Sequence, residues 1–441
     1  MRILSLLTFL ALGPQALFSP PQARAFSPQA QAGRAVMDKA QCTRCHPVSD
    51  GAVPGIPAAA RDFHCVNCHT WILGTKGKPT EIALMRQEMP DWDRYLENIV
   101  HFTRLPDLGS LTRKVRPSFV RSFLDGPFDL RPHLDESMIP VRLSAAQKDQ
   151  VVAYLTELAG KDVAQDGPAG PVPSAEQIAL GKALLVQRGC FACHVAGEAP
   201  LVPGLTAAVY GKLEMPGKLA PDLAHVRARI PRAVLVKYIN DPLAVDPNSA
   251  MPKQPVVGDD AERIADYLLH GDLGAPEGRT QVPEIPVLAR KVGYDEVHEK
   301  VFGFVCVHCH MHPESNNGDG GAGNDGGLGF AGVRLNLETY EGIKAGLVRD
   351  GQRIDILESK DGRPPVLLEA LLRRHAEAAR DFRPAFSQRG PLGPPTDTVR
   401  PGMPLGLPPL TEENLSLVKT WLAQGAPGPV KDRVPEGMGG R

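Results

Sequence analysis

The amino-acid sequence predicts an all-α protein in which tandem helical units are joined by long loops rich in Pro and Gly. Residues 106–140 and 221–252 align at an offset of 115 residues, with three prolines in register. Each copy ends in a methionine close to a proline, and a helical pattern follows it, over residues 143–158 and 262–271. Repetition of a whole segment together with its helix indicates one structural unit per domain.

The helix after each repeated segment is amphipathic. Residues 143–158 place Val151, Leu155 and Leu158 on one helix face, and residues 262–271 are the counterpart. A third helix of this kind is expected in residues 408–427, after Met403, with Thr411 as its N-cap.

Composition limits the function classes. The chain has 441 residues, which is enough for two to four domains. With 49 basic and 50 acidic residues, it lacks the basic surface of a nucleic-acid-binding protein. Aromatic residues make up only 5% of the chain, so we expect other large apolar groups to fill its cores.

The first 25 residues have the pattern of a secretory signal peptide. Arg2 precedes an apolar run from Ile3 to Leu12, and a small-residue site predicts cleavage after Ala25. An uncleaved anchor is the alternative, although the run is shorter than the roughly 20 residues that span a bilayer. We therefore expect an exported, periplasmic protein whose mature chain has no transmembrane segment.

All eight cysteines belong to four C-x-x-C pairs, and a histidine follows each pair at once. The motifs are Cys42, Cys45 and His46; Cys65, Cys68 and His69; Cys190, Cys193 and His194; and Cys306, Cys309 and His310. C-x-x-C-H is the attachment signature of c-type haem. Two thioethers form on the vinyl groups of one porphyrin, and the histidine becomes the proximal ligand of the iron. The sequence therefore predicts four covalently bound haems (haem c), numbered below in chain order.

Two other interpretations of the cysteines are weaker. Four disulfides would suit an exported chain, but they would not require a histidine after every pair. The spacing of the first two pairs fits a zinc site. The third and fourth motifs, however, stand alone and have no partner cysteines.

A glycine lies nine residues before the first cysteine of two motifs, at Gly33 and Gly181. Both glycines fall within expected helices, where glycine costs about 1 kcal/mol relative to alanine. Close approach of another helix at these points would explain both positions.

The order of helix, C-x-x-C-H, loop, Pro-Asp-Leu, methionine and terminal helix resembles the class I c-type cytochromes, an all-α family. The resemblance covers most of residues 28–160 and 174–271 and the two ends of 293–426. The last of these segments resembles the planctomycete-type cytochrome c variant. We interpret the chain as a dihaem unit at 26–165, a monohaem unit at 170–275, a monohaem unit with a Gly-rich insertion at 285–428, and a flexible tail at 429–441.

The resemblance also implies how each unit holds its haem. The terminal helix would cross the first helix at Gly33 or Gly181. The carbonyl group of Pro106 or Pro221 would support the proximal histidine. A methionine on the opposite side of the iron gives a higher reduction potential than a second histidine does.

Methionines are the expected sixth ligands of two haems: Met251 for the third haem and Met403 for the fourth. The ligands of the first two haems stay open. Met138 suits either of them, with a slight preference for the second. The remaining iron could take Met89, Met85, His64 or His101.

Four haems on one exported chain predict an electron-transfer protein. It would carry electrons one at a time between periplasmic or membrane redox partners. The alternative is a haem enzyme, peroxidase-like or sulfur-compound-oxidising, with one open or weakly ligated haem in residues 26–165. A third interpretation is a haem scaffold within a membrane respiratory complex.

Overall fold

The structure is a computed structural model that describes residues 26–48, 65–88, most of 92–165, 171–196, 215–274, 284–313, 328–377 and 401–430. The expected signal peptide, His64, Met89, residues 316–327 of the Gly-rich insertion and residues 431–441 lie outside the described residues, as do the side chains of Cys65 and Cys68. Within the described part of the chain, no helix is long and apolar enough to cross a membrane.

The described chain is mainly α-helical, as the sequence predicts. One departure from the all-α prediction is an antiparallel pair of short strands, β1 (Leu347–Arg349) and β2 (Gln352–Ile354). Asp350 and Gly351 join the strands with positive φ angles of 51° and 75°. A tight hairpin turn requires such angles, and Asp-Gly is a frequent sequence at this position.

The first packing unit is built on the crossing of α1 (Pro28–Lys39) and α9 (Ala145–Ala159). A Cβ atom on Gly33 would lie 1.9 Å from the carbonyl oxygen of Gln150, much closer than real Cβ atoms approach. The predicted close approach at Gly33 is therefore confirmed. The unit also contains α2 (Cys42–Cys45), α4 (Cys65–Gly74), α5 (Pro79–Glu88), α7 (Leu111–Lys114), α8 (Pro117–Asp125) and the 3₁₀ helix η1 (Gly160–Asp162).

The second packing unit repeats this crossing with α10 (Ala175–Gln187) and α16 (Asp260–His270). A Cβ atom on Gly181 would lie 2.1 Å from the carbonyl oxygen of Arg263 and 2.8 Å from the Cβ atom of Tyr267. The prediction for Gly181 is thus also confirmed. The other helices of the unit are η2 (Cys190–Ala192), α12 (Met215–Lys218), η3 (Leu223–His225), α13 (Val226–Arg229), α14 (Arg232–Asn240) and α15 (Pro242–Val245).

The third packing unit surrounds Trp421, which is fully buried on α23 (Glu412–Ala423). Its ring meets the ring of Phe302 edge to face at 5.8 Å, and its Nε1–H donates to the carbonyl oxygen of Pro427 at 2.9 Å. Thr411 caps α23 by accepting a hydrogen bond from the backbone of Asn414, as the sequence predicts. The remaining helices are α17 (Tyr294–Val297), the π-helix η4 (His298–Cys306), α19 (Leu328–Ala331), α20 (Tyr340–Ala345) and α21 (Val366–Glu377).

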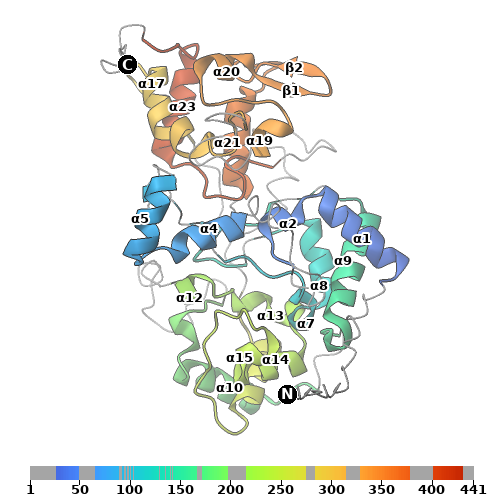
Figure 1. The fold of residues 1–441 in the computed structure, drawn as a ribbon. Coiled ribbons are helices and arrows are strands. Elements are labelled where there is room, and N and C mark those ends of the chain that lie inside the picture. Colours follow the sequence, from blue (N-terminus) through green and yellow to red (C-terminus); the bar gives the residue numbers. More distant parts are fainter. Residues whose placement is uncertain are drawn as a thin grey trace, which may run out of the picture.

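The first packing unit lies between the other two (Figure 1). Its Arg116 donates a backbone hydrogen bond to the carbonyl oxygen of Arg229 in the second unit at 2.8 Å. Its Ser137 donates one to the carbonyl oxygen of Gly406 in the third unit at 3.1 Å. Residues far apart in the sequence therefore meet on both sides of the first unit.

Candidate cofactor-binding cavity

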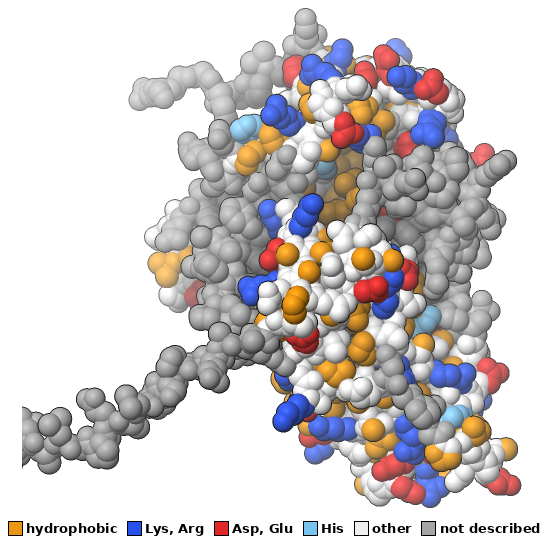
Figure 2. Space-filling model, turned by 90° about the vertical axis from the view of Figure 1, so that its right-hand side faces the viewer, with side chains coloured by type: hydrophobic (Ala, Val, Ile, Leu, Met, Phe, Trp, Pro, Cys, Tyr) orange, Lys and Arg blue, Asp and Glu red, His pale blue; other side chains and the backbone are white. Residues whose placement is uncertain are grey.

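One mainly apolar cavity of about 1230 Å³ extends through all three packing units. It exceeds the roughly 300–1,000 Å³ of a pocket for one small ligand. Its lining includes most of the residues that the sequence predicts for haem sites: Cys42, Cys45, His46, His69, Cys190, Cys193, His194, Cys306, Cys309, Met138, Met251 and Met403. Figure 2 shows hydrophobic side chains in a hollow on one face, between the uppermost part of the molecule and its middle.

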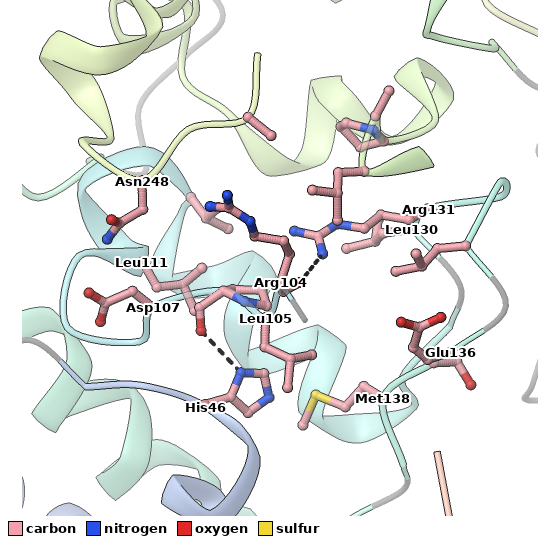
Figure 3. A pocket seen from close by; sticks show the side chains of 18 of the residues that line it. His46, Arg104, Leu105, Asp107, Leu111, Leu130, Arg131, Glu136, Met138 and Asn248 are labelled. Carbon is pink, nitrogen blue, oxygen red and sulfur yellow. Dashed lines mark hydrogen bonds between the residues drawn. The ribbon is translucent and has the colours of Figure 1, made fainter. Parts of the chain in front are cut away.

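The ring of His46 is held from one side. Its Nδ1 lies 3.1 Å from the carbonyl oxygen of Pro106, so Nδ1 carries the proton and Nε2 keeps its lone pair. Burial lowers the pKa of His46, so the ring is neutral at pH 7, the state in which imidazole binds a metal. Figure 3 shows the thioether of Met138 directed toward this ring. The two side chains thus have the arrangement expected of the proximal and sixth ligands of one iron.

This position of Met138 differs from the slight preference for the second haem in the sequence interpretation. Met138 packs against the hydrophobic core of the first unit together with Cys42, the first cysteine of the first motif. The number of residues between a histidine and a methionine does not determine which way the methionine points. The side-chain packing therefore places Met138 beside the first motif rather than the second.

His194 repeats the geometry of His46. Its Nδ1 lies 2.8 Å from the carbonyl oxygen of Pro221, and burial lowers the pKa of its ring as well. The expected support of both histidines by proline carbonyl groups is confirmed. Met251 lines the same cavity, and its backbone N–H donates to the Ser249 hydroxyl at 3.1 Å. The Ser249 hydroxyl is in turn 2.6 Å from the Tyr238 hydroxyl, which fixes the loop that carries Met251.

His69 has a different support. Its Nδ1 lies 2.5 Å from the carbonyl oxygen of His101, and the His101 ring lies 3.1 Å from a carboxylate oxygen of Glu136. The other carboxylate oxygen of Glu136 accepts the backbone N–H of Phe102 at 3.1 Å. The backbone of His101 therefore lies behind His69, on the side away from its Nε2. This position does not suit His101 as the sixth ligand of the second haem.

His310 is buried and does not belong to the lining of the cavity. Gly329 lies against its ring, because a Cβ atom there would come within 2.6 Å of the His310 Cε1 atom. Met403, the expected ligand on the other side, lines the cavity and is fixed by a 2.9 Å hydrogen bond from its N–H to the carbonyl oxygen of Ala370. Met85 lies on α5 and is not part of the lining.

The cysteines of the third motif, Cys190 and Cys193, are both free thiols, so they do not form a disulfide with each other. Burial raises the pKa of both thiols, and it raises the pKa of Cys306 to about 12. These sulfurs are therefore protonated rather than thiolate ligands ready for a metal ion. Among the described residues, no group of three or more His, Cys, Asp or Glu side chains could hold a metal ion.

Arg131 and Arg229 line the cavity where the first and second packing units meet. Arg131 lies next to Leu130, whose carbonyl oxygen accepts the backbone N–H of Asp222 at 2.9 Å. Removal from water, together with Arg131, lowers the pKa of Arg229 to about 10, which leaves Arg229 charged at neutral pH. No carboxylate among the described residues forms an ion pair with Arg229. The sequence reasoning missed this site, since nothing in the local sequence distinguishes these arginines from surface arginines.

These features fit haem. Free thiols and neutral imidazoles match its covalent and proximal attachment, since the contacts of His46 and His194 with proline carbonyl groups use Nδ1 and leave Nε2 for a metal. A buried arginine cation that forms no ion pair among the described residues matches the propionate groups of haem, because guanidinium binds carboxylates well. No protein-family model, curated protein or solved structure matches this chain.

Proposed function

We propose that the chain is a tetrahaem c-type cytochrome with tandem cytochrome c-like units that carries electrons one at a time between redox partners. The observation that carries this proposal is the shared cavity: cysteines of three motifs, the terminal histidines of three motifs and the expected ligands Met138, Met251 and Met403 line one apolar space. Unrelated structural cysteines would have no reason to face a common apolar cavity together with methionine thioethers.

Different residues of the chain attach, orient and ligate the cofactor. The cysteine thiols attach each haem covalently, and Pro106 and Pro221 orient the proximal imidazoles through their carbonyl groups. Met138, Met251 and Met403 provide sixth ligands for the first, third and fourth haems. Bound haem supplies an iron that changes oxidation state by one electron. The apolar lining keeps water from the irons, and Arg131 and Arg229 balance the charge of the propionates.

The docking of the units supports transfer inside one molecule. The first unit forms hydrogen bonds with both of the others, and an ion pair joins its Lys114 to Asp246 of the second unit at 2.6 Å. Haems that share one cavity would lie close to one another without any swinging of the units. The mature protein would work in the periplasm, as the pattern of the first 25 residues indicates. There it would meet its redox partners through small, short-lived contacts.

An enzyme remains the second candidate because of His69. Among the described residues, no methionine is positioned for the second haem once Met138 is assigned to the first. An iron with only five ligands could bind a peroxide or a sulfur compound directly.

The proposal is tested by producing the chain in a host that attaches haem c and measuring the number of haems per chain and the number of redox steps. The mass of the protein and the pyridine haemochrome absorbance should both give four haems per chain, and potentiometric titration should resolve four one-electron steps. A variant with Cys190→Ala and Cys193→Ala should hold three haems and lose one step. A full-length, folded wild-type protein without covalent haem would refute the proposal.

Carbon monoxide binding to the same preparation distinguishes an electron carrier from an enzyme. Carbon monoxide is added to the fully reduced protein and the bound molecules are counted. No binding means four six-coordinate irons and supports the carrier. Ready binding of one molecule per chain, followed by turnover of peroxide or thiosulfate, would support the enzyme instead.

A further inference from the structure

Arg374 is completely buried on α21, where the third packing unit meets the first. A guanidinium ion that leaves water loses its hydration, which is costly unless other groups replace it. Glu377, one turn further along the helix and also buried, has a carboxylate oxygen 3.6 Å from Nη1 of Arg374. That separation is too long for a hydrogen bond, so the donors of this arginine must reach other segments of the chain.

One of these segments is the loop from Gly402 to Leu407, which carries Met403 and is called the Met403 loop below. Nε of Arg374 donates a hydrogen bond to the carbonyl oxygen of Leu407 at 2.5 Å. At the other end of the loop, the N–H of Gly402 donates to a carboxylate oxygen of Glu377, also at 2.5 Å. Side chains of α21 thus hold both ends of the Met403 loop.

The Met403 loop also lies directly on the backbone of α21. A Cβ atom on Gly402 would lie 2.2 Å from the backbone nitrogen of Arg374 and 2.4 Å from its Cα atom, so the loop needs glycine at this point. The N–H of Met403 donates to the carbonyl oxygen of Ala370, one turn before Arg374 on the same helix, at 2.9 Å. The position of α21 therefore sets where Met403 meets the cavity that it lines.

The other segment that Arg374 contacts belongs to the first packing unit. Its Nη1 donates to the hydroxyl oxygen of Ser137 at 2.9 Å, and the N–H of Ser137 donates to the carbonyl oxygen of Gly406 in the Met403 loop at 3.1 Å. Ser137 is therefore bonded twice to the third unit. The next residue, Met138, directs its thioether toward His46 (Figure 3). One guanidinium group thus contacts both the Met403 loop and the residue beside Met138.

The shape of the arginine side chain suits this position. Guanidinium has a planar fork whose donors point in fixed directions, whereas the lysine ammonium is a compact point charge. Nε can therefore serve the Met403 loop while Nη1 serves Ser137. The neighbouring Arg373 shows the contrast, because its guanidinium group pairs at 2.6 Å with Glu369, four residues earlier on the same helix. Arg373 thus pairs within its own helix, and Arg374 joins that helix to a loop and to another unit.

We propose that Arg374 is a positioning residue that holds Met403 and Met138 in place for the fourth and first haems at the same time. This inference rests on the proposed function, which gives the two methionines their role as sixth ligands. A ligand stays in place only while the contacts that support its backbone persist. Loss of the Arg374 contacts would then weaken ligation at two haems in different packing units, whereas Met251 in the second unit would keep its haem.

The test uses the full-length holoprotein with Arg374→Met, which keeps a long side chain and removes its donors. The matched control is Arg373→Met, the adjacent arginine of the same helix. Both variants should contain four haems per chain. Arg374→Met should bind two more equivalents of carbon monoxide than the wild type and lower two of the four reduction potentials, because methionine ligation raises the potential. Arg373→Met should match the wild type in both measurements.

Two further variants make the test independent of a single substitution. Arg374→Lys keeps a cation but lacks donors in the two fixed directions, so the same two potentials should fall. Ser137→Ala removes only the hydroxyl oxygen and reports even if the Arg374 variants do not fold. It should lower the same two potentials by a smaller amount.

Hydrogen exchange of the same proteins supplies a readout that does not depend on haem. Peptides that contain Ser137 or Met403 should exchange faster in Arg374→Met, and peptides from α16 should not change. Unchanged potentials in Arg374→Met, with or without faster exchange, would overturn the positioning role, as would a change at one haem alone or equal effects of Arg373→Met. A wild-type protein without four haems would refute the proposed function instead, while the exchange measurement would still test the contacts of Arg374.

Discussion

Replacement of Gly181 by alanine tests whether the helix crossing organises the second packing unit. The added Cβ atom would lie 2.1 Å from the carbonyl oxygen of Arg263 and 2.8 Å from the Cβ atom of Tyr267. Both contacts involve atoms at or next to the backbone, so no flexible side chain can move aside. The two helices α10 and α16 must separate instead.

The expected cost follows from two opposing effects. Overpacking of a tight core costs about 1–3 kcal/mol, and a clash with a carbonyl oxygen belongs at the upper end of that range. Alanine gains about 1 kcal/mol over glycine in helix propensity. We therefore expect Gly181→Ala to destabilise the second packing unit by about 2 kcal/mol. If exchange occurs through unfolding of this unit, amide hydrogens of α10 and α16 should exchange about 30-fold faster.

Hydrogen exchange measured by mass spectrometry on the holoprotein can follow each unit separately. Peptides from α1 and α9 in the same sample should be unchanged, because the first unit keeps its own crossing. The matched control is Gly74→Ala, since a Cβ atom at Gly74 would meet nothing within 4 Å. Equal exchange of α16 in the Gly181→Ala variant and the wild type would refute the reasoning.

Three further changes test other parts of the structure. Burial raises the pKa of Glu377 to about 7, so the stability that the protonated side chain contributes is present below pH 4.5 and is lost as the pH rises through 7. The melting temperature of the wild type should fall over this range, and Glu377→Gln should flatten the fall. Identical pH profiles of the two proteins would contradict this role of Glu377. Under the proposed function, Arg229→Gln removes a cation from the cavity and should lower the reduction potential of one haem, whereas Arg263→Gln on the exposed face of α16 should not. Equal potentiometric titrations of both variants would refute the role of Arg229. Under the same proposal, Met251→Ala should open the third haem to one equivalent of carbon monoxide, and an unchanged count would show that another residue ligates that iron.

The helix crossings could be predicted from the sequence because the signal is local and costly. A glycine inside a helix has to be compensated by something, and Gly33 and Gly181 occur at the same distance before a motif. The proline carbonyl contacts were implied by the resemblance to class I c-type cytochromes, and Pro106 and Pro221 occupy the same position in the repeated segment. In both cases the residues that make the contact recur at a fixed spacing along the chain.

The surroundings of His69 could not be predicted in the same way. Its carbonyl partner comes from His101, and the orienting carboxylate comes from Glu136, at separations that no repeat shares. The direction of Met138 depends on packing against the first unit, which the sequence does not specify. Features that depend on how one unit docks against another are visible only once the units are placed together.

Residues 136–138 explain why the sites in the first unit depend on one another. Glu136 orients the group behind His69, Ser137 bonds to Gly406 of the third unit, and Met138 faces His46. Three consecutive residues therefore serve the second site, the docking of the third unit and the first site. Since adjacent residues cannot shift independently, a displacement of this segment would disturb the surroundings of His69, the side chain that faces His46 and the unit contact together. Under the proposed function, the docking of the third unit is thus a condition for correct ligation in the first, and separately produced units are expected to bind haem less well than the whole chain.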